Sequence, residues 1–150
     1  MARKASRRRP LPVDACHDCG TMMRERKATL KLPVNGEQIS VPGVSHLVCP
    51  KCGEIVLRFD EAGQLHRQAL EIYRQKYGLL SSVEIRAVRE RLGLTQTELE
   101  RLQRLGKNTL SRWEAGRNVQ SASMDLLLRL IRDVPGSVEE ELAGRSQAYV

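Results

Sequence analysis

The sequence predicts an α+β fold of two small domains, because its pattern of apolar residues changes from that of strands to that of helices near residue 60. Residues 20–48 alternate between apolar and polar side chains, as strands with one buried face do. Residues 60–133 carry apolar residues at helical spacing and are divided by glycine and proline. We expect a disordered basic arm (1–13), a β-rich module (14–60), a linker helix (61–80), an all-α domain (81–136) and a C-terminal tail (137–150).

The four cysteines of the chain form two Cys-x-x-Cys pairs, Cys16 with Cys19 and Cys49 with Cys52. A two-residue gap lets one tight turn direct two sulfurs at a single metal ion, and four thiolates make a closed tetrahedral zinc site. A module of about 45 residues buries little core on its own. Zinc binding contributes on the order of 10–16 kcal/mol in zinc-finger peptides. We therefore expect one structural zinc ion that clips the β-rich module.

A redox pair and a catalytic zinc site are the competing interpretations of these cysteines. A redox Cys-x-x-Cys usually comes singly in a βαβ setting, and catalytic zinc usually keeps three protein ligands and a water. His17 is redundant as a fifth ligand, and His46 and His66 have no ligand pattern. The sequence also lacks a Ser/His/Asp set, paired carboxylates and a His-Glu-x-x-His motif. We therefore expect no enzyme.

The β-rich module has strong turn signals between its expected strands. Asn-Gly is the most frequent sequence of a two-residue hairpin turn. The expected order is a strand at 24–32, a hairpin turn at Asn35-Gly36, a returning strand at 38–41, a second turn at Pro42-Gly43 and a strand at 44–48.

The second half of the chain contains several helix start and stop signals. Ser81-x-x-Glu84 and Thr95-x-x-Glu98 are capping boxes, in which a hydroxyl and a carboxylate satisfy free amides of the first turn. The expected helices are 60–77, a helix from Ser81 to the stop at Gly93, 95–103, about 107–115, and one capped by Ser121 or Ser123 and stopped by Pro135-Gly136, with residues 137–145 as a candidate for one more.

The helices 95–103 and 107–115 have the dimensions of a helix-turn-helix that reads DNA. In the second helix Leu110 and Trp113 face the expected core, whereas Asn108 and Arg112 are one turn apart on the other face. Asparagine pairs with adenine and arginine with guanine in the major groove, so we expect these two side chains to contact bases. Expected contacts with the DNA backbone come from their neighbours, Thr97, Lys107, Thr109, Ser111 and Arg117. The alternative is a polar helix face that is only solvated.

The charge distribution fits a nucleic-acid partner. The net charge is +7, and the first 13 residues hold five basic residues and no acid. A disordered, solubilising tail is the other interpretation of this arm. Pro10 and Leu11 follow the arginines in place of an apolar run, so no export signal is expected. With no stretch of about 18 apolar residues, we expect a cytoplasmic protein without a membrane segment.

Residues 94–116 (LTQTELERL…NTLSRWEAG) resemble the Xre/Cro-type helix-turn-helix, which has a Thr-Gln start, a Glu-Leu pair, a turn and a Leu-Ser-Arg-Trp-Glu-x-Gly segment. The resemblance implies that Gln96 contacts a phosphate. Two positions depart from the pattern: Glu100 replaces a small residue, and Arg104 stands at the usual turn glycine. The geometry of the turn is therefore the open question of this segment.

The whole order of a four-cysteine module, one long helix and an Xre-type domain resembles the MqsA-like (YgiT-type zinc finger) antitoxins over about residues 14–135. The family implies that the zinc module binds a cognate toxin, typically a small ribonuclease. It also implies that the C-terminal domain forms a homodimer, binds a palindromic operator and represses its own operon. In the family the residues at the positions of Asn108 and Arg112 contact bases. The alternative is a free-standing helix-turn-helix regulator with a structural zinc module and no toxin.

Overall fold

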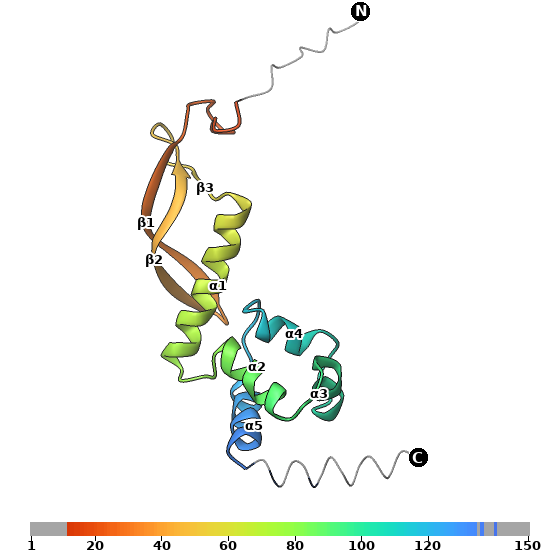
Figure 1. Cartoon of the computed structure of the whole chain (residues 1–150). Coiled ribbons are helices and arrows are strands. Elements are labelled where there is room, and N and C mark those ends of the chain that lie inside the picture. Colours follow the sequence, from red (N-terminus) through yellow and green to blue (C-terminus); the bar gives the residue numbers. More distant parts are fainter. Residues whose placement is uncertain (1–11, 135, 137–139, 141–150) are drawn as a thin grey trace, which may run out of the picture.

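The computed structural model describes residues 12–134, 136 and 140 and shows an α+β fold, as predicted (Figure 1). A small antiparallel sheet and five helices follow one another along the described chain. The elements are β1 (Arg24–Val34), β2 (Glu37–Val48), β3 (Ile55–Val56), α1 (Phe59–Lys76), α2 (Ser82–Arg91), α3 (Gln96–Leu102), α4 (Thr109–Glu114) and α5 (Ala122–Asp133). The sheet has the order β1-β2-β3. Most of the basic arm and the candidate helix at 137–145 lie outside the described residues.

The hairpin of β1 and β2 turns at Asn35-Gly36, as the sequence predicts. Both residues have positive φ, 49° and 84°, which is the conformation of a type I′ turn. The second predicted turn, at Pro42-Gly43, is wrong, because β2 continues through these residues. Ala28 pairs with Val44 and Leu30 with Val41, so two residues of β2 oppose one of β1 in a β-bulge. Pro42 has no amide proton to donate, and Gly43 has a φ of 68°. Both properties suit a β-bulge as well as a turn.

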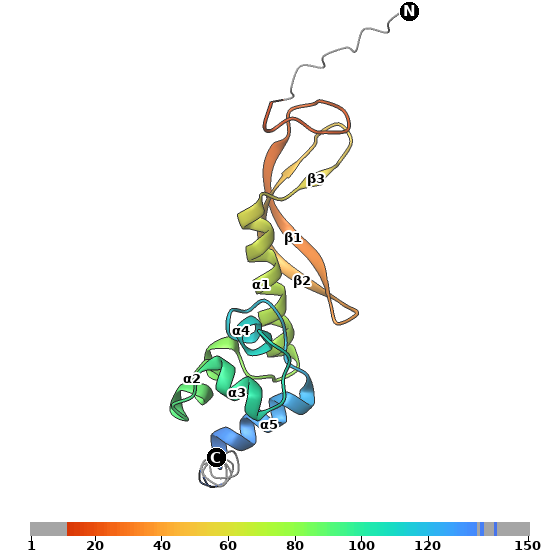
Figure 2. The same cartoon turned by 90° about the vertical axis from the view of Figure 1, so that its right-hand side faces the viewer.

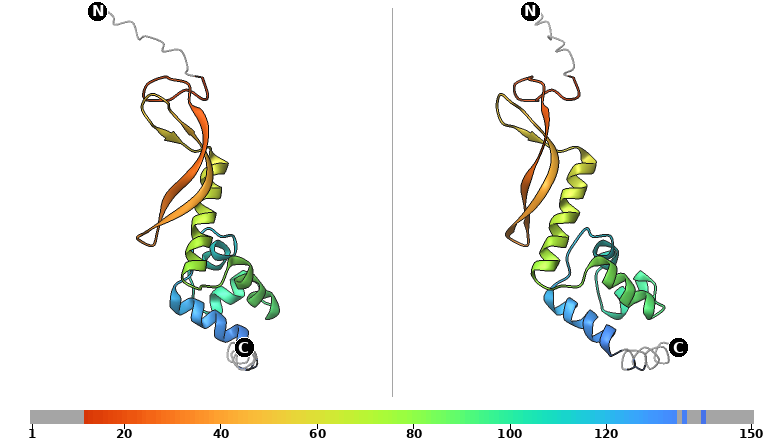
Figure 3. Two further views of the ribbon diagram at one scale, coloured as in Figure 1. Left: turned by 90° about the vertical axis from the view of Figure 1, so that its left-hand side faces the viewer. Right: turned by 60° about the vertical axis from the view of Figure 1, so that its left-hand side comes forward.

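Helix α1 lies along the twisted hairpin and covers one face of it (Figures 2 and 3). The apolar residues that point toward α1 from the strands alternate with exposed polar residues. The core between helix and sheet consists of Val34, Ile39, Val41, Val44, Leu65, Ala69 and Leu70. A separate small core at the cysteine end contains Met23 and Leu47 with Cys16 and Cys49.

Helices α2 to α5 enclose another core, made of Leu80, Ile85, Val88, Leu99, Leu110, Trp113, Leu128 and Ile131. Both predicted capping boxes are present, since the hydroxyls of Ser81 and Thr95 accept hydrogen bonds from the third amide of each helix. Ser121 caps α5. None of the helices in the described part of the chain is long and apolar enough to cross a membrane.

The predicted start of the helix at about 107–115 is wrong. Helix α4 begins at Thr109, because Asn108 has a left-handed backbone conformation at φ 62° and forms the residue before the first turn. Asparagine adopts this conformation at lower cost than most residues. The expected pair Asn108 and Arg112 therefore spans the boundary of α4, although the Arg112 amide still donates to the Asn108 carbonyl.

Candidate metal centre and nucleic-acid interface

The two cysteine pairs lie in two turns with the same backbone geometry. The Gly20 amide donates to the Cys16 carbonyl at 2.8 Å, and the Gly53 amide donates to the Cys49 carbonyl at 3.0 Å. Both glycines have left-handed φ values, 70° and 78°. A residue with a side chain would be strained at these positions, which explains the glycine that follows each Cys-x-x-Cys.

The four sulfur atoms converge on one point, although β1 and β2 separate the two turns along the chain. The Sγ–Sγ distances are 3.5 Å from Cys16 to Cys52, 3.4 Å from Cys19 to Cys49 and 3.8 Å from Cys19 to Cys52. All four sulfurs lie within 4.8 Å of one another. A metal–sulfur bond of about 2.3 Å gives a tetrahedron with an edge of about 3.8 Å, so the arrangement fits a four-coordinate ion. The cysteines can thus hold a metal, and the exposed His17 is not part of the cluster.

The pKa values of two of the four thiols are shifted in opposite directions. Hydrogen bonds with the Thr21 hydroxyl and amide lower the pKa of the Cys19 thiol to about 6. The Glu54 amide lowers the pKa of Cys52, but the neighbouring sulfurs of Cys49 and Cys16 outweigh this effect and raise it to about 12. Four crowded sulfurs therefore oppose full ionisation until a cation compensates their charge.

The residues predicted to meet DNA gather around α3 and α4. Asn108 and Arg112 are both exposed; Asn108 is the residue before α4, and Arg112 is the fourth of the six residues of the helix. Among the predicted backbone contacts, Thr97, Lys107 and Arg117 are exposed and Gln96, Thr109 and Ser111 are half-buried. The Gln96 amide donates to the Glu114 carboxylate at 2.8 Å, which holds the start of α3 beside α4.

The basic and acidic side chains between residues 96 and 118 differ sharply in their partners. The five basic side chains are exposed and have no hydrogen bond or ion pair with any described residue: Arg101, Arg104, Lys107, Arg112 and Arg117. The three acids in the same stretch are all occupied. Glu98 caps its own helix, and Glu100 and Glu114 are buried. The basic side chains of residues 96–118 are therefore available to an external partner, whereas the acids of this stretch are engaged within the protein.

Glu114 is an intradomain partner for nearby basic side chains. Its carboxylate accepts two hydrogen bonds from Arg89, at 2.6 and 2.9 Å, and lies 3.5 Å from Arg86. Burial raises the pKa of Glu114, but the hydrogen bonds from Arg89 and Gln96 outweigh burial and lower it below its usual value. The ionised carboxylate thus fastens α2 and α3 to α4.

Two buried charges lie at the ends of α4. The Glu100 carboxylate accepts hydrogen bonds from the amides of Asn108, at 3.3 Å, and Leu110, at 2.9 Å. The Asn108 side chain accepts no hydrogen bond from the first amides of α4, so the Glu100 carboxylate, eight residues earlier in α3, acts as the N-terminal cap of α4. This explains a carboxylate where the Xre pattern has a small residue. At the other end Arg74 of α1 donates to the Trp113 carbonyl. Sequence analysis missed Arg74, whose signal was its position four residues after Leu70 on the buried face of α1.

Comparison with known protein families gives one match. The model of the antitoxin component of bacterial toxin–antitoxin systems, MqsA, matches residues 14–142. No curated protein matches the chain. The match begins just before the first cysteine pair and includes all five helices. The chain therefore belongs to the MqsA family of antitoxins of bacterial toxin–antitoxin systems.

Proposed function

We propose that this protein is a DNA-binding antitoxin that binds a small ribonuclease toxin and represses its own operon as a homodimer. The observation that carries the DNA-binding part is the face of α3 and α4, where every basic side chain is free and every acid is engaged internally. A surface of this kind attracts phosphates without internal competition. Membership of the antitoxin family supports the toxin partner. We infer no catalytic activity and a cytoplasmic location.

In this proposal α3 and α4 form an Xre-type helix-turn-helix and α4 enters the major groove. Asn108 and Arg112 would contact base edges, because both are exposed and lie one turn apart. The free amides at the start of α3 and the exposed Thr97, Lys107 and Arg117 would contact phosphates. Arg104, at the turn, adds a further free charge to this group.

The experiment that tests the DNA interface uses a duplex from the region upstream of the protein's own reading frame and a scrambled duplex of equal length. Asn108→Ala and Arg112→Ala should each weaken binding to the upstream duplex by about 1–3 kcal/mol and relax its sequence preference. Lys107→Ala should weaken both duplexes similarly and reduce the slope of log K against log salt by about 0.9. Arg26→Ala is the matched control, since Arg26 is exposed on β1 and has no described side-chain partner.

If the Asn108 and Arg112 variants shift the upstream duplex as well as the wild type does, the assignment of base contacts is wrong. A homodimer should appear in analytical ultracentrifugation and should protect two half-sites about one helical turn apart in a footprint. A single protected half-site would contradict the dimer.

For the cysteine cluster we propose one structural zinc ion, held by Cys16, Cys19, Cys49 and Cys52, that stabilises the end of the sheet. A closed set of four thiols leaves no open coordination position for catalysis. Metal analysis of protein purified without added metal should give one zinc per chain, and Cys49→Ser should lose it together with resistance to proteolysis near the sheet. Retention of one equivalent of zinc by the Cys49 variant would contradict this ligand set.

The toxin partner is tested by co-expression with the neighbouring reading frame, followed by a pulldown and an assay of growth rescue. Rescue and a stable complex with a ribonuclease support the antitoxin role. If the protein binds the upstream duplex but the neighbouring reading frame gives neither a stable complex nor growth rescue, the second candidate function is favoured, a free-standing regulator, which the unpaired basic side chains of residues 96–118 support by themselves.

A further inference from the structure

Arg74 is a fully buried arginine in the last turn of α1, with 1% of its surface exposed. Its guanidinium donates to the main-chain carbonyls of Trp113, at 3.2 Å, and Asn118, at 2.7 Å. It also donates to the Gln120 side chain at 3.4 Å and to the partly exposed Glu71 carboxylate at 3.3 Å. Arginine is rarely buried unless its donors are occupied, and here they are directed at one target, the end of α4 and the loop that follows it.

The position of these carbonyls explains why a cation is favourable there. Trp113 is the second-last residue of α4, and Asn118 lies in the loop between α4 and α5. The Trp113 carbonyl already accepts a hydrogen bond from the Gly116 amide at 3.1 Å, but it also carries part of the negative end of the helix dipole, which a cation stabilises. Arg74 thus caps the C-terminal end of α4 from another element, as Glu100 caps its N-terminal end. A helix of only six residues receives an external charged partner of the favourable sign at each end.

Arg74 itself is held firmly from the side of the sheet. It follows Ala69 and Leu70, which pack against Val41 and Val44 in the core between α1 and the hairpin. Two residues further on, Lys76 and Tyr77 donate hydrogen bonds to the Glu37 carboxylate at the hairpin tip. The end of α1 therefore has little freedom to move relative to β1 and β2.

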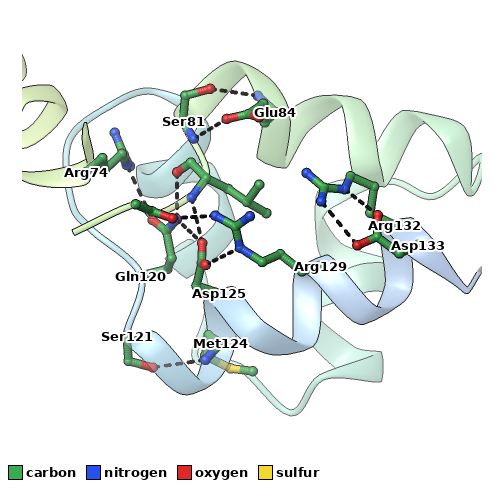
Figure 4. A network of polar contacts seen from close by, with 12 residues as sticks. Arg74, Ser81, Glu84, Gln120, Ser121, Met124, Asp125, Arg129, Arg132 and Asp133 are labelled. Carbon is green, nitrogen blue, oxygen red and sulfur yellow. Dashed lines mark hydrogen bonds and ion pairs between the residues drawn. The ribbon is translucent and has the colours of Figure 1, made fainter. Parts of the chain in front are cut away.

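Gln120 connects Arg74 to the start of α2 and to α5 (Figure 4). Its amide oxygen accepts from Arg74, and its amide nitrogen donates to the Leu80 carbonyl at 2.7 Å and to Asp125 at 3.0 Å. Asp125 in turn accepts from the Leu80 amide at 2.7 Å and from Arg129 at 2.7 Å. The loop after α4 is thus bound on one side to the helix of the sheet and on the other to the helical core.

We propose that Arg74 is a positioning residue for DNA recognition, through which the helix packed on the β-sheet fixes the position of α4 relative to the rest of the DNA-binding face. The inference rests on the proposed DNA-binding function. Phosphate contacts tolerate small displacements of a flexible lysine or arginine, whereas base contacts depend on the placement of the helix in the groove. Loss of Arg74 should therefore reduce sequence preference more than overall DNA affinity.

The test measures the ratio of affinities for the upstream duplex and the scrambled duplex in full-length protein. This ratio is independent of the fraction of folded protein, because unfolded chains reduce both affinities by the same factor. Arg74→Gln should lower the ratio about tenfold, on the order of one lost base contact. Arg74→Lys keeps the charge but replaces the planar guanidinium by a single ammonium group, so it should lower the ratio less. Arg26→Gln removes the same charge from an exposed site and should leave the ratio unchanged.

The fluorescence of Trp113, the single tryptophan of the chain, gives a second measurement that needs no DNA. The emission of folded Arg74→Lys should shift relative to the wild type, because the contact to the Trp113 carbonyl is altered. An unchanged affinity ratio and an unchanged emission in the lysine variant would overturn the inference. If the wild type shows no preference between the two duplexes, both the proposed function and this inference are wrong. If the wild type shows a preference that the Arg74 variants retain, the inference fails alone.

Discussion

Replacement of Glu100 by alanine removes the cap at the start of α4 and should destabilise the helical core. The Glu100 side chain is buried, and its two oxygens accept the amides of Leu110 at 2.9 Å and Asn108 at 3.3 Å. Asn108 is left-handed and makes no cap hydrogen bond with its own side chain. In Glu100→Ala both amides lose this partner, because no other side chain of the described residues bonds to them.

The structure sets the size of this effect. Loss of a helix cap costs about 0.5–2 kcal/mol. A buried amide left without a partner costs about 1–3 kcal/mol. Since the Leu110 bond is short and the Asn108 bond is long, we count one full hydrogen bond and expect a loss of about 2 kcal/mol in the free energy of unfolding. For a chain of this length that corresponds to a decrease of about 4–8 °C in Tm.

Urea unfolding followed by Trp113 fluorescence is a suitable assay, because Trp113 lies in α4 and is buried. Glu100→Gln is the matched variant, since it keeps an acceptor oxygen and removes the negative charge at the N-terminal end of the helix. We expect it to lose about 1 kcal/mol or less. A Glu100→Ala protein within about 0.3 kcal/mol of the wild type would refute the capping role. Equal losses in both variants would show that charge, and not hydrogen bonding, makes the contribution.

Three further predictions concern the same helices. Gln103→Leu should raise the free energy of unfolding by about 1–3 kcal/mol, because both polar atoms of the Gln103 amide are buried and have no hydrogen-bond partner among the described residues; a lower urea midpoint would contradict it. Arg104→Gly should raise Tm, because Arg104 is left-handed at φ 52° at a cost of about 1–2 kcal/mol, while the lost charge should weaken DNA binding. The urea midpoint should stay level between neutral pH and about pH 5 and then fall. Burial raises the pKa values of Glu114 and Asp125, but the hydrogen bond from Arg89 to Glu114 and that from Arg129 to Asp125 outweigh burial and lower both pKa values below their usual range. As the pH falls, the unfolded chain therefore binds protons before the folded protein does, and stability decreases. A constant urea midpoint down to about pH 3 would exclude this linkage.

Local signals made much of the fold predictable from the sequence. Asn35-Gly36 and the capping boxes at Ser81 and Thr95 are determined by interactions within three residues, and all of them are present. The α+β class follows from the change in periodicity, and the convergence of the sulfurs follows from two identical Cys-x-x-Cys-Gly turns. The turn and capping signals need no knowledge of distant residues, whereas the convergence of the sulfurs also depends on the hairpin that brings the two cysteine turns together.

The errors have a common physical cause, which is the dependence of a local conformation on a distant partner. Pro42-Gly43 is compatible with a turn or a bulge, and pairing with β1 selects the bulge. An asparagine at position 108 could be the first helical residue or a left-handed residue that precedes the helix. The Glu100 carboxylate, which accepts a hydrogen bond from the Asn108 amide, stabilises the left-handed conformation. Arg104, which stands where the Xre pattern has a glycine, likewise has a left-handed backbone conformation, which glycine adopts at lower cost.

The same dependence bears on how α4 could act as the DNA-reading helix that we propose. A helix of six residues is far shorter than the roughly 12–15 residues that an isolated helix needs in water, so its conformation must come from its surroundings. Leu110 and Trp113 supply one apolar face, and Glu100 and Arg74 supply partners for its terminal amides and carbonyls. Because Arg74 belongs to the helix that covers the sheet, a change at the sheet that displaces α1 must also disturb the end of α4. Under our proposal, sequence-specific DNA binding should therefore respond to events at the cysteine-bearing half of the protein without any direct contact between that half and DNA.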